Sequence, residues 1–126
     1  MGHFKDLKAW QHARSLAVLS KAAIAQLPES EREGLADQWK RASYSVVLNI
    51  AEGASRRGTK EFRRFLDIAR GSLHEIEAIL DLALALDYSV PMNSPRFRRL
   101  GRNARKRCTA CYEGSRTARS NLDARI

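Results

Sequence analysis

The sequence predicts an all-α protein that forms an antiparallel, up-down four-helix bundle. Proline occurs only three times in 126 residues, and glycine lies mostly between segments of regular apolar spacing. Four segments repeat apolar residues at intervals of three and four, which is the period of an α-helix. The connections between them are short, which favours antiparallel neighbours. We therefore expect a single bundle domain at 1–116, followed by a frayed or disordered tail at 117–126.

The first predicted helix covers about residues 4–27, and Pro28 ends it. Its apolar seam consists of Trp10, Ala13, Ala17, Ser20, Ile24 and Leu27. The second predicted helix covers about residues 31–53, because Ser30 followed by Glu33 has the form of a capping box. Its core-facing stripe consists of Leu35, Trp39, Ala42, Val46, Ile50 and Gly53.

The third predicted helix covers about residues 59–87 and opens at Thr59. Its core stripe consists of Phe62, Phe65, Leu66, Ala69, Leu73, Ile76, Leu80 and Ala83. The fourth predicted helix covers about residues 96–114, after a short turn between Pro91 and Pro95. Its narrow packing stripe consists of Phe97, Leu100, Gly101, Ala104, Cys108, Cys111 and Ser115.

The second and third helices each carry an additional apolar side that a small bundle does not need for its own core. A helix at the surface of a monomer normally leaves its outer side polar. An extra apolar side therefore indicates a surface that another subunit covers. We expect a homo-oligomer whose interface includes Tyr44, Val47, Leu48, Ile68, Ile79, Leu82 and Leu86.

Positive charge is concentrated in the fourth helix. Residues 96–126 hold ten Arg and Lys against Glu113 and Asp123, which gives +8 of the net charge of +9. A concentrated basic element is typical of proteins that bind a polyanion, and Lys and Arg near phosphates gain affinity by releasing counterions. Tyr112 is the only exposed aromatic candidate that we expect in this segment, so the means for stacking on single-stranded bases are limited. The predicted nucleic-acid-binding residues are Arg98, Arg99, Arg102, Arg105 and Lys106 of this helix, with Arg56 and Arg57 from the loop at 54–58 between the second and third helices.

Metal and cofactor chemistry have little support in the sequence. The three histidines lie on different segments, and Cys108 and Cys111 form one pair without the second pair that a zinc site requires. We interpret both cysteines as core residues. No Gly-rich phosphate loop is present. We therefore expect no metal, no cofactor and no enzymatic activity.

One enzyme class stays open as the least favoured alternative, a divergent helical-bundle ribonuclease. Such enzymes use an Arg followed by four to six residues and a His. Arg70 precedes His74 with three residues between them, so the spacing departs from the motif. On a helix this separation still places both side chains on neighbouring turns.

Three motifs resemble those of a bacterial four-helix-bundle family that includes the proteins encoded by intervening sequences of 23S ribosomal RNA genes. The first is the opening segment 4–11, FKDLKAWQ, and the second is 49–53, NIAEG. The third is Glu61-Phe62 with 65–72, FLDIARGS, and Glu75. Together the motifs cover the first three helices, whereas the Arg-rich fourth helix matches no motif of the family.

The resemblance implies an antiparallel four-helix bundle assembled as a ring-like homopentamer. It also relates the chain to the accessory variability proteins of diversity-generating retroelements, which bind nucleic acid and a reverse transcriptase through basic surfaces. The family brings no catalytic activity with it.

The leading hypothesis is a non-enzymatic, homo-oligomeric bundle that binds structured RNA or DNA through its fourth helix. The alternative is a protein-interaction scaffold whose basic face docks an acidic protein such as a reverse transcriptase. Neither a signal-peptide core nor a transmembrane segment is evident, so we expect a cytoplasmic protein without a membrane partner.

Overall fold

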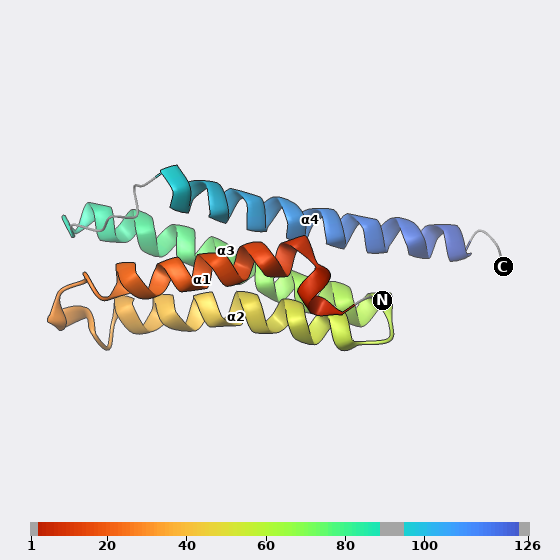
Figure 1. Cartoon of the computed structure of the whole chain (residues 1–126), viewed down its shortest axis with the longest axis horizontal. Helices are drawn as coiled ribbons and strands as arrows, with labels where there is room; N and C mark the ends of the chain where they lie inside the picture. The colour runs from red at the N-terminus through yellow and green to blue at the C-terminus, as the bar shows by residue number, and fades with distance from the viewer. Residues whose placement is uncertain (1–2, 89–94, 124–126) are drawn as a thin grey trace.

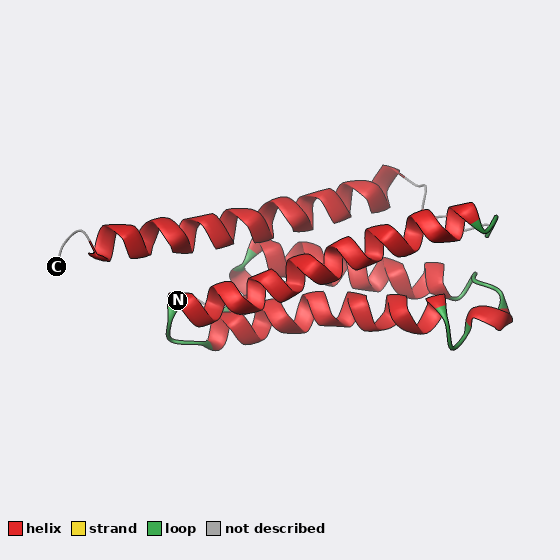
Figure 2. Cartoon of the chain, turned by 180° about the vertical axis from the view of Figure 1, so that it is seen from behind, coloured by secondary structure: helices red, strands yellow, loops and turns green. Residues whose placement is uncertain are grey.

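The computed structural model describes residues 3–88 and 95–123, with side chains described as far as Gly114. It contains four α-helices and, within the described residues, no strand (Figure 2). The helices are α1 (Lys8–Ile24), α2 (Leu35–Ser55), α3 (Thr59–Ala85) and α4 (Pro95–Asp123). Two short 3-10 helices, η1 (Phe4–Asp6) and η2 (Glu29–Glu31), precede α1 and α2. The all-α, four-helix prediction is confirmed.

The four helices lie lengthwise beside one another, as Figure 1 shows. Helix α1 packs against α2 and α4, and α3 packs against the same two helices. The most extensive contact joins α2 and α3, where the Ser72 hydroxyl donates a hydrogen bond of 2.8 Å to the Ser45 hydroxyl. We refer to α1 with α4 as one layer and to α2 with α3 as the other.

The core lies between the two layers and includes Trp39, Val46, Ile50 and Leu66, which are fully buried. Every predicted core residue of α2 and α3 is buried except Leu35 and Leu80, which pack half-buried against the core. This burial follows from the three- and four-residue spacing, which places those positions on one side of each helix.

The predicted apolar seam of α1 is wrong at three positions, each of which follows a buried residue by one place in the sequence. The buried residues of the helix are Ala9, Ala13, Leu16, Ser20 and Ala23. Three predicted seam residues, Trp10, Ala17 and Ile24, are half-buried at its edge. Small side chains along the buried side let α1 approach its neighbours closely, while the Trp10 ring meets Phe4 of η1 at a centroid distance of 5.0 Å.

The predicted capping box at Ser30 and Glu33 is wrong, and α2 begins four residues later than expected. The segment that contains Ser30 forms η2, so the chain has not yet entered α2. Gly34 occupies the N-cap position with φ −105° and ψ −112° and supplies no side chain. The Glu31 carboxylate instead accepts a hydrogen bond of 3.0 Å from the Leu35 N–H, which satisfies a free donor of the first turn.

Helix α3 ends at Ala85, two residues before the predicted end. Asp87 has φ 59°, in the left-handed region that Asp tolerates better than most residues. The Tyr88 N–H then donates to the Ala83 carbonyl at 3.0 Å, which closes the helix end. The Tyr88 hydroxyl also donates to Glu31 at 2.9 Å and ties this end of α3 to the connection between α1 and α2.

Helix α4 is longer than predicted, because it continues through Gly114 to Asp123. The expectation of a frayed or disordered tail at 117–126 stays a prediction, although α4 reaches Asp123. Residues 124–126 and Pro91 of the predicted turn lie outside the described residues. The end of α4 extends past the other helices (Figure 1). Its backbone hydrogen bonds lie within the helix itself. None of the described helices combines the length and apolar character needed to cross a membrane.

Candidate nucleic-acid interface

Charge is divided unequally between the two layers. Helix α1 contains Lys8, Arg14 and Lys21 and no acidic residue. Helix α4 contains nine Arg and Lys against Glu113 and Asp123. In the other layer, α2 holds two basic and two acidic residues, and α3 holds four basic and five acidic residues. The α1/α4 layer is therefore strongly cationic, whereas the α2/α3 layer is close to neutral.

The predicted basic residues of α4 divide between the two long edges of the helix. Arg98, Arg102 and Arg105 line a groove on the edge toward α3. Lys106 lies on the opposite edge, toward α1. Arg99 is exposed and precedes Lys106 by seven residues, so helical spacing places it in the same row. The structure does not bring these five cations together as one cluster.

A second groove lies between α1 and α4 and is lined by four polar or basic residues and one alanine. Its walls are His12 of α1 and Asn103, Lys106, Arg107 and Ala110 of α4. The imidazole, amide, ammonium and guanidinium groups offer hydrogen-bond donors, and no carboxylate lines the groove. Such a lining suits an anion such as a phosphate. His12 and Arg107 were missed by the sequence analysis, although the lack of acidic residues in α1 was a signal that this helix shares the cationic surface.

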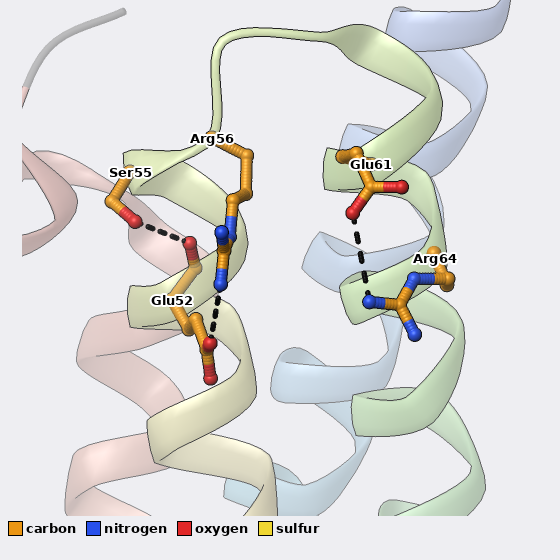
Figure 3. A network of polar contacts seen from close by, with 5 residues as sticks. All are labelled: Glu52, Ser55, Arg56, Glu61 and Arg64. Atoms are coloured by element: carbon orange, nitrogen blue, oxygen red, sulfur yellow. Dashed lines mark hydrogen bonds and ion pairs between the residues drawn. The ribbon is translucent and has the colours of Figure 1, made fainter.

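The loop between α2 and α3 holds one of its two predicted binding residues in an internal ion pair. The Arg56 guanidinium lies 2.6 Å from the Glu52 carboxylate, and the Ser55 hydroxyl donates to the Glu52 carbonyl at 2.7 Å (Figure 3). Arg64 lies 3.5 Å from Glu61 at the start of α3. Arg57 is exposed. Of the two predicted loop residues, Arg57 therefore offers the more available cation.

The loop lies far from the beginning of α4. Tyr112 of α4 contacts Arg63, which is near the start of α3, through a hydrogen bond of 3.0 Å from the guanidinium to the hydroxyl. Arg98 precedes Tyr112 by fourteen residues, which corresponds to about 21 Å along a helix. The predicted loop residues and the first turns of α4 therefore lie at different places along the bundle.

Tyr112 is not an exposed stacking platform, contrary to the expectation from sequence. Its half-buried ring lies between the guanidinium groups of Arg63, at 4.5 Å, and Arg70, at 5.2 Å. Cations over an aromatic face are attracted by its negative quadrupole. The ring therefore joins α3 to α4, and a base would have to displace an arginine to stack on it.

The two residues of the ribonuclease alternative have different partners. Arg70 contacts Tyr112 and lies 3.9 Å from Asp67. His74 is exposed and lies 3.9 Å from Glu77. Their side chains are thus held by separate groups on α3 and α4.

The cysteines behave as packing residues. Cys108 is fully buried, and burial raises the pKa of its thiol to about 12. Cys111 is half-buried, and burial raises its pKa as well. Both stay protonated at neutral pH, so neither is a reactive thiolate. Within the described residues, no group of three His, Cys, Asp or Glu could hold a metal ion.

The α2/α3 layer exposes most of the predicted interface residues. Tyr44, Leu48, Ile68, Leu82 and Leu86 are between 42% and 64% exposed. We refer to these five residues as the outer apolar face.

Two predicted interface residues do not belong to the outer apolar face. Ile79 is only 6% exposed and lies in the core, so its assignment to the outside was wrong. Val47 is half-buried and packs against the core. Both positions lie at the border between the two apolar stripes of their helix, where spacing alone does not distinguish inside from outside.

Comparison with protein families gives one match. Residues 5–109 match the family model described as 23S rRNA-intervening sequence protein. No match was found among curated proteins. The matched span covers α1, α2, α3 and the first half of α4, including the segments whose motifs resemble this family. The chain therefore belongs to the 23S rRNA-intervening sequence protein family.

Proposed function

We propose that this member of the 23S rRNA-intervening sequence protein family is a non-enzymatic, homo-oligomeric up-down helical bundle that binds structured RNA or DNA. Binding takes place on the cationic α1/α4 layer, and subunits associate through the outer apolar face of the α2/α3 layer. The cytoplasm is the expected compartment.

The observation that carries this proposal is the segregation of charge between the layers. A nucleic-acid surface gains affinity from cations that neutralise phosphates and loses it where carboxylates face the backbone. The groove between α1 and α4 has hydrogen-bond donors from both helices, two cations from α4, and no carboxylate in its lining. The binding residues that we assign are His12, Arg99, Lys106 and Arg107.

The position of Tyr112 favours a structured nucleic acid over a single strand. Single-strand binding proteins combine a cationic groove with exposed aromatic rings on which bases stack. The Tyr112 ring is instead engaged by two arginines. A surface of cations without stacking rings recognises the phosphate backbone and its shape, which duplex regions present regularly.

The outer apolar face supports self-association. The five large side chains of this face are each about half exposed, and exposed apolar surface is typical of protein–protein interfaces. A ring-like homopentamer is the assembly that we propose, and it would repeat the cationic layer around the ring. Repetition raises the effective concentration of weak phosphate contacts.

The absence of catalysis is part of the proposal. Arg70 and His74 have separate partners, and the thiols of both cysteines have raised pKa values. A catalytic pair would need a base within hydrogen-bond reach of the group that it activates. The side chains described in α1 to α4 give support to binding rather than to a reaction.

The test measures the affinity of the purified protein for a labelled RNA hairpin and for a DNA duplex at low and high salt, by fluorescence anisotropy. The variant Arg99→Glu, Lys106→Glu, Arg107→Glu reverses three charges of the α1/α4 layer. The matched control Lys40→Glu, Arg41→Glu, Lys60→Glu makes the same charge change on exposed residues of the α2/α3 layer.

We expect the α4 variant to lose affinity by about a hundredfold or more, because each charge-assisted contact contributes about 1.5 kcal/mol or more. Its dependence on salt should also become shallower, by roughly 0.9 in log–log slope for each lost phosphate contact. The control variant should bind nearly as well as the native protein.

Three outcomes would contradict the proposal. Equal losses in both triple variants would mean that net charge alone drives binding. Weak binding that hardly responds to salt would favour the acidic-protein scaffold instead. Cleavage of the RNA that persists through purification and is lost in His74→Ala would establish the ribonuclease.

A further inference from the structure

A groove with an apolar floor lies between α3 and α4. It encloses about 370 Å³, within the range of roughly 300–1,000 Å³ that is typical of small-molecule sites. Its polar residues lie on the two helices that flank it. The floor consists of Leu16, Leu73, Ile76, Leu80, Leu84 and Phe97.

Gly101 contributes backbone and no side chain to the lining of this groove. It lines the groove on α4, and a Cβ built on its backbone would meet nothing within 4 Å. A glycine inside a helix costs about 1 kcal/mol relative to alanine, and no close contact inside the chain requires one at this position. The residue without a side chain therefore lies beside the apolar floor of the groove.

The rim of the groove carries charges of both signs, and the cations are on α4. Arg105 lies 3.0 Å from Glu77 of α3, so these two charges largely offset each other. Arg98 and Arg102 follow on the α4 side, one helical turn apart, and Asp81 is on the α3 side. The three arginines and two carboxylates of the rim give it a net charge of +1, and all of the positive charges are on α4.

We propose that this groove binds a monocarboxylate with an aliphatic body, such as a medium-chain fatty acid. The alkyl chain lies on the apolar floor, and the carboxylate accepts hydrogen bonds from Arg102 with support from the charge of Arg98. A guanidinium fork matches a carboxylate in geometry and charge. This site is separate from the nucleic-acid interface, because none of its lining residues lines the groove between α1 and α4.

The lining discriminates against other classes of ligand. A polyanion such as a nucleoside triphosphate would meet the carboxylates of Glu77 and Asp81, and it would find no polar group on the floor for its sugar or base. A cationic amphiphile would meet the arginines of α4. An amphiphile with a single negative charge fits both the floor and the rim.

The test uses isothermal titration calorimetry with decanoate below its micelle concentration, on the full-length protein and with no nucleic acid present. The blocking variant is Gly101→Leu, which places an isobutyl group in the groove. The matched control is Gly114→Leu on the same helix, where a built Cβ also meets nothing within 4 Å and which does not line the groove. Both substitutions raise helix propensity, and circular dichroism verifies that both variants are folded.

We expect the native protein and Gly114→Leu to bind one decanoate per chain. In Gly101→Leu, affinity should fall about tenfold or more, because the added side chain occupies the volume of the alkyl chain. Arg102→Gln should weaken decanoate by about tenfold through loss of a charge-assisted hydrogen bond. The same variant should leave the binding of decanol unchanged.

The proposal is overturned if the native protein does not bind decanoate, or if Gly101→Leu and Gly114→Leu bind it equally well. It is also overturned if decyltrimethylammonium binds as tightly as decanoate, since the rim would then select no charge. Neither result would bear on RNA affinity, so a failure here is separable from a failure of the nucleic-acid interface.

Discussion

The α1/α4 layer and the α2/α3 layer present opposite kinds of surface, although both bury their inner sides in one core. The first exposes cations with few carboxylates, and the second exposes large apolar side chains in a region of balanced charge. Five large side chains are exposed on α2 and α3 in the outer apolar face, whereas Val18 is the one large apolar residue of comparable exposure in the described part of α1 and α4.

Under the proposed function, the two layers have different roles, one in nucleic-acid binding and the other in self-association. A cationic surface stays accessible to a polyanion only if subunits associate elsewhere, because like charges repel across a shared interface. An apolar surface without net charge can be covered by another copy without that cost. Placing the two surfaces on different layers allows assembly and nucleic-acid binding to occur together.

The largest expected effect comes from placing charge on the outer apolar face. In Leu48→Asp, Leu82→Asp, we expect the proposed oligomer to dissociate into monomers, because each leucine contributes about 1.5–3 kcal/mol on burial. Light scattering with size-exclusion chromatography measures the mass.

The control for this pair is Val18→Asp, which introduces an aspartate at a side chain that is 63% exposed on α1. It should leave the mass unchanged. A native protein that is monomeric, or a double variant that keeps the native mass, would remove the outer apolar face as an interface.

The next largest effect concerns the close packing of α2 against α3. A Cβ at Gly53 would lie 2.7 Å from the Phe65 Cβ and 3.1 Å from a ring carbon of Phe62. Gly53→Ala should therefore destabilise the protein by about 1–3 kcal/mol through overpacking. Urea unfolding followed by circular dichroism measures the change, and a variant as stable as the native protein would show that α2 can move away from α3 at no cost.

A glycine-to-alanine substitution on the outside of α3 should instead raise the free energy of unfolding. A Cβ at Gly71, in the middle of α3, meets nothing within 4 Å, and the residue is exposed. We expect Gly71→Ala to stabilise the isolated chain by up to about 1 kcal/mol through helix propensity. Destabilisation in the same urea assay would indicate that another subunit packs closely over this position.

The smallest effect concerns the hydrogen bond between Glu31, in the connection between α1 and α2, and Tyr88, after the end of α3. Hydrogen bonds from the Leu35 N–H and the Tyr88 hydroxyl lower the pKa of the Glu31 carboxyl. The same contact raises the pKa of Tyr88. The link therefore stabilises the fold above the ordinary pKa of Glu31 and below that of Tyr88, and its contribution is lost as pH falls through the lowered carboxyl pKa or rises through the raised phenol pKa.

Glu31→Gln should consequently lower the melting temperature most near neutral pH, with the gap to the native protein closing in acid and in alkali. Melting curves across pH measure this, with Glu29→Gln as a control at a neighbouring exposed carboxylate. A gap that does not vary with pH would show that the charge of Glu31 is not what matters. Neither variant should change the oligomer mass or RNA affinity.

The sequence predicted the core better than it predicted the candidate interface. Spacing placed Trp39, Val46, Ile50 and Leu66 inside because burial repeats with the helical period. The same argument failed for Ile79 and for the seam of α1, where two adjacent stripes are both apolar and only packing selects between them. It also assigned α4 one cationic side, whereas the structure divides those cations between two grooves.

By itself, the sequence determined that the protein is helical, that four segments form its helices, and that positive charge is concentrated in the last of them. These properties follow from local spacing and composition, which every window of the chain carries. Only the tertiary structure decided that α1 joins α4 as a cationic layer, that Tyr112 is held between Arg63 and Arg70, and that Gly101 faces an apolar groove. Each of these depends on which helices are neighbours and at what register, and both are set by the packing of side chains distant in sequence.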